Sequence, residues 1–243
     1  MNLIKLNAID STNTYLKRLA KETYQEDKTV VVAESQLSGR GQMGNGWLSR
    51  EGQSLTFSVL KRFEALDVEK QFMISMAVSL GISEAIKALQ IPNIAIKWPN
   101  DILSAKKKIG GILIENILEG SNVKYSVIGI GINVNETDFP ALPQASSFKL
   151  ETGKTFQLAE VLQLLLKTIF KNLENLSAKD FLELKTHYEK DLFRRDVVSF
   201  FEKNNGLGFN GIIKGISDSG ELLVEIENNS LQKFQLKEVK LIY

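Results

Sequence analysis

The stretch Gly39-Arg40-Gly41-Gln42-Met43-Gly44-Asn45-Gly46-Trp47 lies between two predicted strands and is the most informative part of the chain. Glycine has no Cβ atom, so a glycine-rich loop can bring its backbone close to a ligand. Backbone N–H groups and the planar guanidinium of Arg40 suit a phosphate or a carboxylate. The indole of Trp47 adds a flat apolar face on which a ring could stack. A surface loop with a chance arginine has the same composition, so the stretch alone leaves both interpretations open.

The sequence on either side of this loop alternates between strand and helix patterns. Short β-branched or alternating runs predict strands over residues 29–34, 55–60, 94–98, 109–115 and 124–135. Apolar residues at helical spacing predict helices over residues 14–22, 69–89, 157–173 and 178–190. This order predicts an α/β (α+β) fold in which a mixed or antiparallel sheet is backed by helices.

The pattern changes from about Arg194 onward, where short strands are separated by polar turns. Asn204-Asn-Gly and Ser217-Asp-Ser-Gly are turn sequences of the kind that close hairpins. We therefore expect a small all-β barrel over 193–243, following a larger domain over 1–192.

Composition excludes several classes of function. The chain of 243 residues has 30 Lys and Arg against 29 Asp and Glu, so a net charge of +1 gives no overall footprint for DNA. It has no cysteine and only His187, which rules out thiolate or multi-histidine metal sites and makes a Ser-His triad improbable; we predict no resident metal site. There is no secretory signal and no apolar run of membrane-spanning length, which predicts a cytoplasmic protein with no membrane partner.

Glycines inside predicted strands mark positions where another group approaches the backbone, because a glycine there weakens the strand. Gly110 and Gly111 lie in one strand, and Gly129 and Gly131 lie in the next. Two polar clusters frame them: Asp10-Ser-Thr-Asn before the first helix, and Lys97-Trp-Pro-Asn-Asp at the abrupt end of a strand.

Four segments in fixed order resemble the biotin–protein ligases, and more loosely the superfamily that includes lipoate–protein ligases. They are Asp10-Ser-Thr-Asn, the glycine loop, Lys97-Trp-Pro-Asn-Asp with Lys108-Ile-Gly-Gly-Ile-Leu-Ile-Glu, and Gly129-Ile-Gly-Ile-Asn-Val-Asn. The resemblance implies an SH3-like C-terminal barrel and a two-step reaction. Biotin and MgATP form biotinyl-5′-AMP, and a lysine of a biotin carboxyl carrier domain then takes the biotin.

The resemblance also implies residue roles, which agree with the need to hold two anions together in the first step. Catalytic roles fall to Arg40, Lys108 and Asp101. The implied biotin contacts are Ser11, Thr12, Asn13, Gln36, Gly39, Arg40, Lys108, Gly110 and Gly111. The implied ATP or adenylate contacts are Arg40, Gly41, Gln42, Trp47, Asn100 and Asn133.

Each assignment has a plainer alternative. The cluster at residues 10–13 can be a helix cap. The run Lys106-Lys-Lys can be solvated, although Lys108 directly precedes a strand; we expect Lys106 and Lys107 at the surface. The segment at residues 97–101 can be a strand terminator, Asn133 a turn residue and Trp47 an apolar anchor.

The chain also departs from the family pattern. Many members carry arginines where this chain has Gln42 and Met43, so we expect a weaker hold on the adenylate. The first motif begins at residue 10, which leaves no room before it for the DNA-binding domain of bifunctional members; we expect no repressor function. A lipoate or octanoate ligase and a non-catalytic biotin-binding module remain the alternatives, and a homodimer remains possible.

Overall fold

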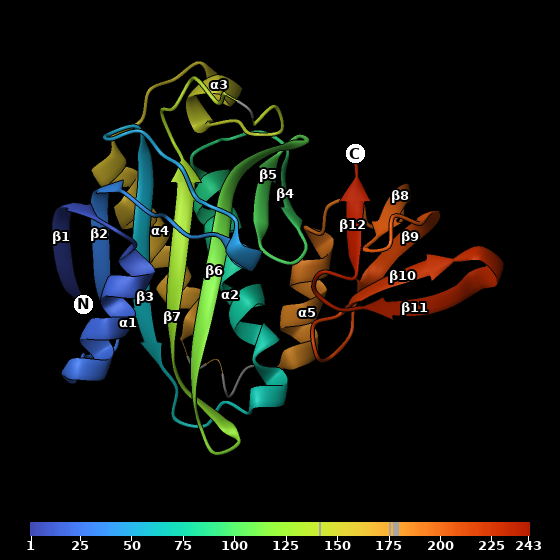
Figure 1. The fold of residues 1–243 in the computed structure, drawn as a ribbon, viewed down its shortest axis with the longest axis horizontal. Helices are drawn as coiled ribbons and strands as arrows, with labels where there is room; N and C mark the ends of the chain where they lie inside the picture. The colour runs from blue at the N-terminus through green and yellow to red at the C-terminus, as the bar shows by residue number, and fades with distance from the viewer. Residues whose placement is uncertain (141, 175, 177–179) are drawn as a thin grey trace.

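A seven-stranded mixed sheet forms the larger part of the computed structural model, which describes residues 1–140, 142–174, 176 and 180–243 (Figure 1). The sheet order is β1-β2-β3-β7-β6-β5-β4. Strands β1 and β2 are parallel, and the other neighbours are antiparallel. In chain order the strands are β1 (Asn2–Ile9), β2 (Thr29–Gln36), β3 (Ser54–Arg62), β4 (Ile94–Lys97), β5 (Asp101–Ser104), β6 (Lys107–Glu119) and β7 (Asn122–Asn133).

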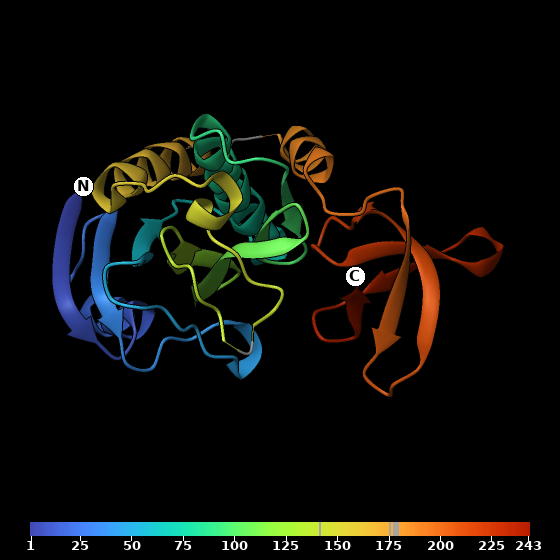
Figure 2. The same cartoon turned by 90° about the horizontal axis from the view of Figure 1, so that it is seen from above.

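Helices cover both faces of this sheet because alternate strand residues are apolar on each side. On one face lie α2 (Phe72–Ala88) and α4 (Leu158–Leu173), which share a core with Val30, Val59 and Ile128 (Figure 2). On the other face α1 (Thr12–Glu22) packs against the next residues along the same strands, Val31, Leu60 and Val127. The shorter helices are α3 (Phe148–Thr152) and α5 (Phe181–Lys190).

A second, five-stranded antiparallel sheet forms the SH3-like C-terminal part, in the order β11-β10-β9-β8-β12. Its strands are β8 (Val198–Lys203), β9 (Gly208–Ile216), β10 (Leu222–Ile226), β11 (Ser230–Phe234) and β12 (Val239–Ile242). Phe201, Phe209 and Phe234 stack in succession inside it. Aromatic packing of this kind lets so small a sheet bury an apolar face.

The turn between β9 and β10 attaches the second sheet to the first part of the protein. Trp98 Nε1 donates to the carbonyl of Gly220 at 2.9 Å, and the backbone N–H of Ile216 donates to Glu189 Oε1 of α5 at 2.9 Å. The backbone of Gly220 packs against the ring of Phe72, so closely that a Cβ atom there would lie 2.2 Å from Cγ. These contacts therefore fix the C-terminal sheet in place relative to the larger sheet.

The predicted fold class is confirmed, and the differences are local. Ser11 caps α1, so this helix begins at Thr12 rather than at residue 14. The predictions did not include β1, β5, β12 or α3; β5, β12 and α3 are only four or five residues long and carry little pattern. Residues 178–179, predicted to begin α5, lie outside the described residues, and the boundary at 192/193 stays a prediction. Within the described part of the chain, no helix is long and apolar enough to cross a membrane.

Candidate active site

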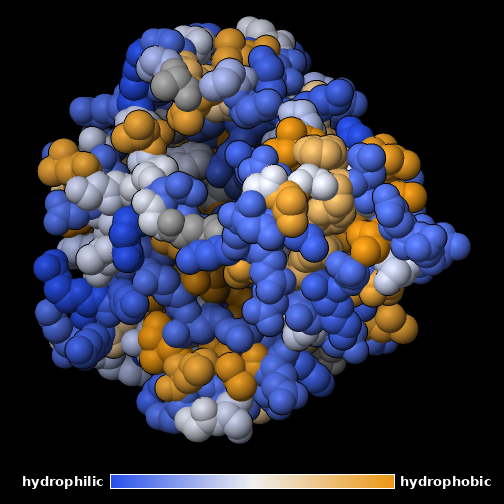
Figure 3. Space-filling model, turned by 45° about the vertical axis from the view of Figure 1, so that its right-hand side comes forward, coloured by the Kyte–Doolittle hydropathy of each residue, from blue (hydrophilic) through white to orange (hydrophobic). Residues whose placement is uncertain are grey.

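A cavity of about 700 Å³ lies between the larger sheet and the C-terminal sheet. The space-filling view shows a recess with hydrophobic surface in its depth and hydrophilic residues around it (Figure 3). Its described lining comes from the start of α1, the glycine loop, residues 97–101, strands β6 and β7, and the C-terminal sheet. This size and this mixture of apolar floor and polar groups are typical of small-molecule sites.

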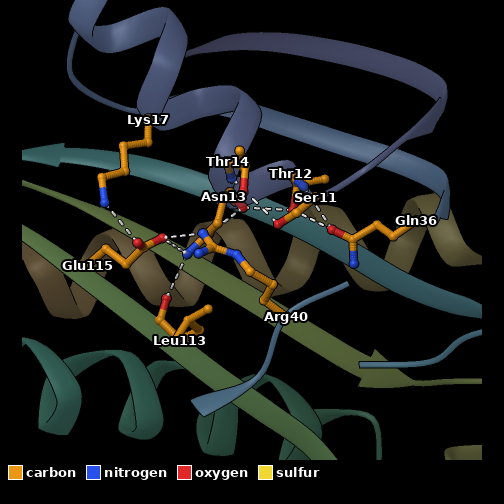
Figure 4. Close-up of polar contacts among 10 residues, drawn as sticks. Ser11, Thr12, Asn13, Thr14, Lys17, Gln36, Arg40, Leu113 and Glu115 are labelled. Carbon is orange, nitrogen blue, oxygen red and sulfur yellow. Dashed lines mark hydrogen bonds and ion pairs between the residues drawn. The ribbon is translucent and has the colours of Figure 1, made fainter. Parts of the chain in front are cut away.

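The start of α1 forms a polar pocket at one end of the cavity (Figure 4). Ser11 caps the helix by accepting from the N–H of Thr14, as the plainer alternative predicted. Gln36 Oε1 accepts from the backbone N–H of Thr12 at 2.8 Å and from its hydroxyl at 3.1 Å. Ser11 and Thr12 thus have structural partners and still line the cavity.

Asn13 is nearly inaccessible, at 2 % exposure, and is held by three groups. Its Nδ2 donates to the carbonyl of Leu113 at 3.2 Å and to Glu115 Oε2 at 3.1 Å. Its Oδ1 accepts from the hydroxyl of Ser58 at 2.6 Å. A Cβ atom at Gly129 would lie 2.4 Å from this oxygen, so the approach predicted for that glycine is made by Asn13.

Arg40 extends from the glycine loop toward β6, the strand that carries Leu113 and Glu115. Its Nη2 forms an ion pair of 3.0 Å with Glu115 Oε2, while Lys17 approaches Glu115 Oε1 at 2.9 Å (Figure 4). Partial burial by itself raises the pKa of Glu115, but the hydrogen bond from Lys17, the charges of Arg40 and Lys17 and the bond from Asn13 together hold that pKa below its usual value. Glu115 is thus ionised at neutral pH.

Trp47 lies over the middle of the cavity floor. A Cβ atom at Gly131 would lie 2.3 Å from Trp47 Cε2, so this glycine is required for the indole to rest on the sheet. Trp47 thus rests on the sheet while it lines the cavity, and Lys108 Nζ lies 5.8 Å from the centre of its ring. The indole N–H is buried and makes no hydrogen bond with the described residues.

Lys108 lines the cavity from β6, whereas Lys106 and Lys107 are exposed as expected. Its Nζ forms an ion pair of 2.6 Å with Asp101 Oδ1, and Lys97 approaches Asp101 Oδ2 at 3.4 Å. Asp101 is the one acidic residue among the described lining residues. The basic lining residues are Arg40, Lys97, Lys108, Lys237 and Lys240.

The structure separates the predicted site residues into those that line the cavity and those that do not. The predicted residues in the lining are Ser11, Thr12, Asn13, Gln36, Arg40, Gly41, Gln42, Trp47, Asn100, Asp101, Lys108 and Gly111. Gly39, Gly110 and Asn133 are outside it. A Cβ atom at Gly110 would meet Ile132 in the core, and Asn133 Nδ2 donates to the carbonyl of Ser146 at 2.9 Å. Asn133 is therefore held by a partner in the fold, outside the lining of this cavity.

Sequence reasoning missed residues of two kinds. It gave no role to Glu115 or Ser58, which hold Asn13, or to the C-terminal sheet, which adds Lys237 and Lys240 to the lining. Ser58 stands between Phe57 and Val59, and Glu115 directly follows Ile112-Leu-Ile; a polar residue next to such apolar residues is the signal that could have marked them. The lysines of the C-terminal sheet have no such signal, because surface lysines are common.

The chain belongs to the Biotin/lipoate A/B protein ligase family, whose model matches residues 6–133. Within that family its similarity is to biotin ligases. It is 33% identical over 230 residues to the bifunctional ligase/repressor BirA of Bacillus spizizenii, covering 93% of this chain and 70% of that protein. It is 28% identical over 220 residues to the biotin–[acetyl-CoA-carboxylase] ligase of Paracoccus denitrificans, covering 88% of this chain and 90% of the relative.

A solved structure has the same fold along almost its full length. The biotin protein ligase of Aquifex aeolicus, in complex with biotin and ATP, superposes with a TM-score of 0.81 at 31% identity, covering 99% of this chain and 98% of that one. The predicted kinship with biotin–protein ligases is therefore confirmed.

Proposed function

We propose that this protein joins biotin to a lysine of a biotin carboxyl carrier domain through biotinyl-5′-AMP. One observation carries the proposal: a single cavity contains the polar pocket at α1, the loop residue Arg40, and the pair of Lys108 and Asp101. The head group of biotin, the reacting carboxylate and phosphate, and the incoming lysine amine could therefore be held in one line. Biotin and ATP bound to the Aquifex relative support the choice of substrates.

In the first step a carboxylate oxygen of biotin bonds to the α-phosphorus of ATP. The bond from that phosphorus to the bridging oxygen breaks, and pyrophosphate leaves. Both reactants are anions, so their approach requires fixed positive charge. Five basic residues against one acidic residue in the described lining supply it.

Arg40 and Lys108 are paired with Glu115 and Asp101 before any substrate binds. Partly exposed ion pairs of this kind are weak, contributing about 0–1 kcal/mol. Substrate carboxylate and phosphate oxygens can therefore become additional partners at small cost. The carboxylates keep the two cations ordered in the meantime.

In the second step the ε-amine nitrogen of the acceptor lysine attacks the carbonyl carbon of the mixed anhydride. The bond from that carbon to the phosphate oxygen breaks, AMP leaves with the electron pair, and the amine loses a proton. Asp101 is the carboxylate of the described lining, and we assign it the role of orienting the amine. Gly41, Gln42, Trp47 and Asn100 are the lining residues that we assign to the nucleotide.

The polar pocket favours biotin over lipoate or octanoate. Thr12, Asn13 and Gln36 are amide or hydroxyl groups with little access to solvent or with partners in the fold. A ligand without matching polar atoms would leave the Gln36 NH₂ group and the remaining lone pair of the Asn13 oxygen without a partner, and sites of this type reject such ligands by about 10⁴-fold.

Mg²⁺ would enter with ATP rather than bind to the protein first. The described residues contain no group of three or more His, Asp or Glu that could hold an ion. Mg²⁺ is commonly held by one or two carboxylates together with substrate phosphates, and Asp101 with Asn100 fits that arrangement. When bound, the ion would neutralise phosphate charge.

Association into a homodimer is also part of the proposal. Strand β1 is an edge of the larger sheet, whereas the opposite edge, β4, is partly paired by residues 191–193 through Ile96. An exposed strand edge is a surface for pairing between chains. Light scattering with and without biotin and ATP would establish the mass in solution.

The transfer reaction tests the proposal. The purified protein is incubated with biotin, MgATP and a biotin carboxyl carrier domain, and the carrier is analysed by mass spectrometry. We expect one biotin on one lysine, and none when that lysine is replaced by arginine. Biotin binding without transfer, in the wild-type protein, would favour a binding module instead.

A further inference from the structure

We infer that Glu115 is a positioning residue that orients the amide of Asn13, so that the Asn13 oxygen faces the bound head group. The inference rests on the proposed function, since it concerns recognition of biotin. Glu115 lies behind the cavity rather than in its lining, on the central strand β6. It therefore acts through Asn13 and not by touching the ligand (Figure 4).

The hydrogen bonds of Asn13 leave it only one way to contact a ligand. An asparagine amide has two N–H donors and an oxygen with two lone pairs. Both donors are used, one by the Leu113 carbonyl and one by Glu115. The Ser58 hydroxyl lies 2.6 Å from the Asn13 oxygen and 2.8 Å from the Thr12 hydroxyl, and we assign its one proton to the shorter contact, which leaves a single lone pair on Asn13 for an N–H group of the ligand.

Glu115 and the Leu113 carbonyl together exclude the opposite orientation of this amide. A rotated amide would place its oxygen against the Leu113 carbonyl and the Glu115 carboxylate, which only accept hydrogen bonds. Glu115 is ionised because Lys17 and Arg40 pair with it. Without an acceptor at this position, the Asn13 amide would lose one of the two acceptors that hold its NH₂ group, and its direction would be less strictly set.

Gln36 supplies the complementary group. Its Oε1 accepts from the backbone N–H of Thr12 at 2.8 Å and lies 3.1 Å from the Thr12 hydroxyl, which directs this oxygen toward α1 and leaves the NH₂ end for a ligand carbonyl. The pocket thus presents an acceptor on Asn13 and a donor on Gln36. A cyclic urea has N–H donors and a carbonyl acceptor in the matching order.

Two variants separate the reach of Glu115 from its charge. Glu115→Asp keeps the charge but is one methylene shorter, so it cannot reach Asn13 at 3.1 Å. Glu115→Gln loses the charge but keeps an oxygen at the right distance. Glu119→Asp is the matched control, because Glu119 lies on the same strand and pairs with Lys124 at the surface.

Titration calorimetry with biotin alone measures the effect. We expect Glu115→Asp to raise the Kd for biotin by about 10- to 100-fold, since a buried amide loses its partner. Glu115→Gln should stay within about threefold of wild type, because its oxygen rescues the bond, and Glu119→Asp should be unchanged. Melting temperatures measured beside the titrations identify any variant that fails to fold.

Equal affinities in the two Glu115 variants, or a weaker Glu115→Gln, would overturn the inference, because either result assigns Glu115 to charge or to packing. If Glu115→Asp does not fold, Glu115→Leu takes its place with the same expectation. A wild-type protein that does not bind biotin would overturn the proposed function, and the inference with it. Wild-type binding with an unaffected Glu115→Asp overturns the inference alone.

Discussion

Lys108 Nζ lies 2.6 Å from Asp101 Oδ1, across the neighbouring strands β6 and β5. Regular pairing places Asp101 opposite Gly111 and Lys108 opposite Leu103, and an irregularity between Ile102 and Leu103 shifts the register between these pairs. Such bulges redirect side chains near functional sites. Lys108, the cation proposed to contact the reacting carboxylate and phosphate, therefore lies beside Asp101, the acidic residue of the described lining.

Replacing Lys108 tests its proposed role in adenylation. Lys108→Met keeps a long side chain but removes the charge, and we expect pyrophosphate exchange to fall by about 10²- to 10³-fold, as on removing one stabilising group from an active site. Lys107→Met, at an exposed neighbour, should retain the wild-type rate. A Lys108→Met protein with more than about a tenth of wild-type exchange would contradict the assignment.

The glycines of β7 give a second prediction. A Cβ atom at Gly131 would clash with Trp47, and one at Gly129 would clash with Asn13. We expect Gly131→Ala and Gly129→Ala each to weaken biotin binding by about tenfold or more, because overpacking shifts the neighbouring side chain. Fluorescence of Trp47 should change in Gly131→Ala and not in Gly129→Ala.

Gly46→Ala is the control for these two variants, since a Cβ atom at Gly46 would have no contact closer than 3.8 Å. It should bind biotin as the wild type does. If Gly46→Ala and Gly131→Ala weaken binding equally, flexibility of the loop, and not the position of Trp47, is the property that matters.

The attachment of the C-terminal sheet gives a third prediction. Gly220 (φ +89) and Gly206 (φ +80) both have left-handed backbones, so alanine is strained at either position. Only Gly220 also contacts Phe72. We expect Gly220→Ala to lower the free energy of unfolding by about 1–3 kcal/mol more than Gly206→Ala does. Urea denaturation measures the difference, and equal losses would show that the contact with Phe72 carries no stability.

A pH series tests the electrostatic account of Glu115. Burial opposes ionisation of this carboxyl, but Lys17, Arg40 and Asn13 hold its pKa below the ordinary value of 4.5. A lowered pKa stabilises the fold fully above about pH 4.5, and the stabilisation is lost as pH falls through the folded-state value. Wild type should therefore exceed Glu115→Gln in Tm near neutral pH, and the gap should close in acid. A gap that stays constant down to about pH 3 would contradict this account.

The sequence indicated which positions are closely approached, but not which side chains approach them. Gly129 and Gly131 were recognised as places of close approach from the rule on glycine in strands, but nothing local indicated that Asn13 and Trp47 would fill them. Such pairs form between segments far apart in the chain, and their geometry follows from the packing of α1 and the loop on the sheet. Strand periodicity carries no information about that packing.

The geometry of the strands explains why two of the three assignments outside the cavity lining, Gly110 and Asn133, did not reach it. Gly110 and Gly111 are adjacent, and successive residues of a strand face opposite sides of a sheet. Only Gly111 therefore lines the cavity, while Gly110 faces Ile132. Asn133 ends β7 beyond the cavity, where its amide binds the Ser146 carbonyl. Residue type marked these positions, but the face of the strand decided the role of Gly110 and the position at the strand end decided that of Asn133.

The central claim is that this cavity activates biotin with ATP, and pyrophosphate exchange tests it most directly. The purified protein is given MgATP and labelled pyrophosphate with biotin, lipoate or octanoate in parallel. We predict exchange with biotin and none above background with the other two acids. Exchange with lipoate or octanoate but not with biotin, or no exchange with any acid, would contradict the account.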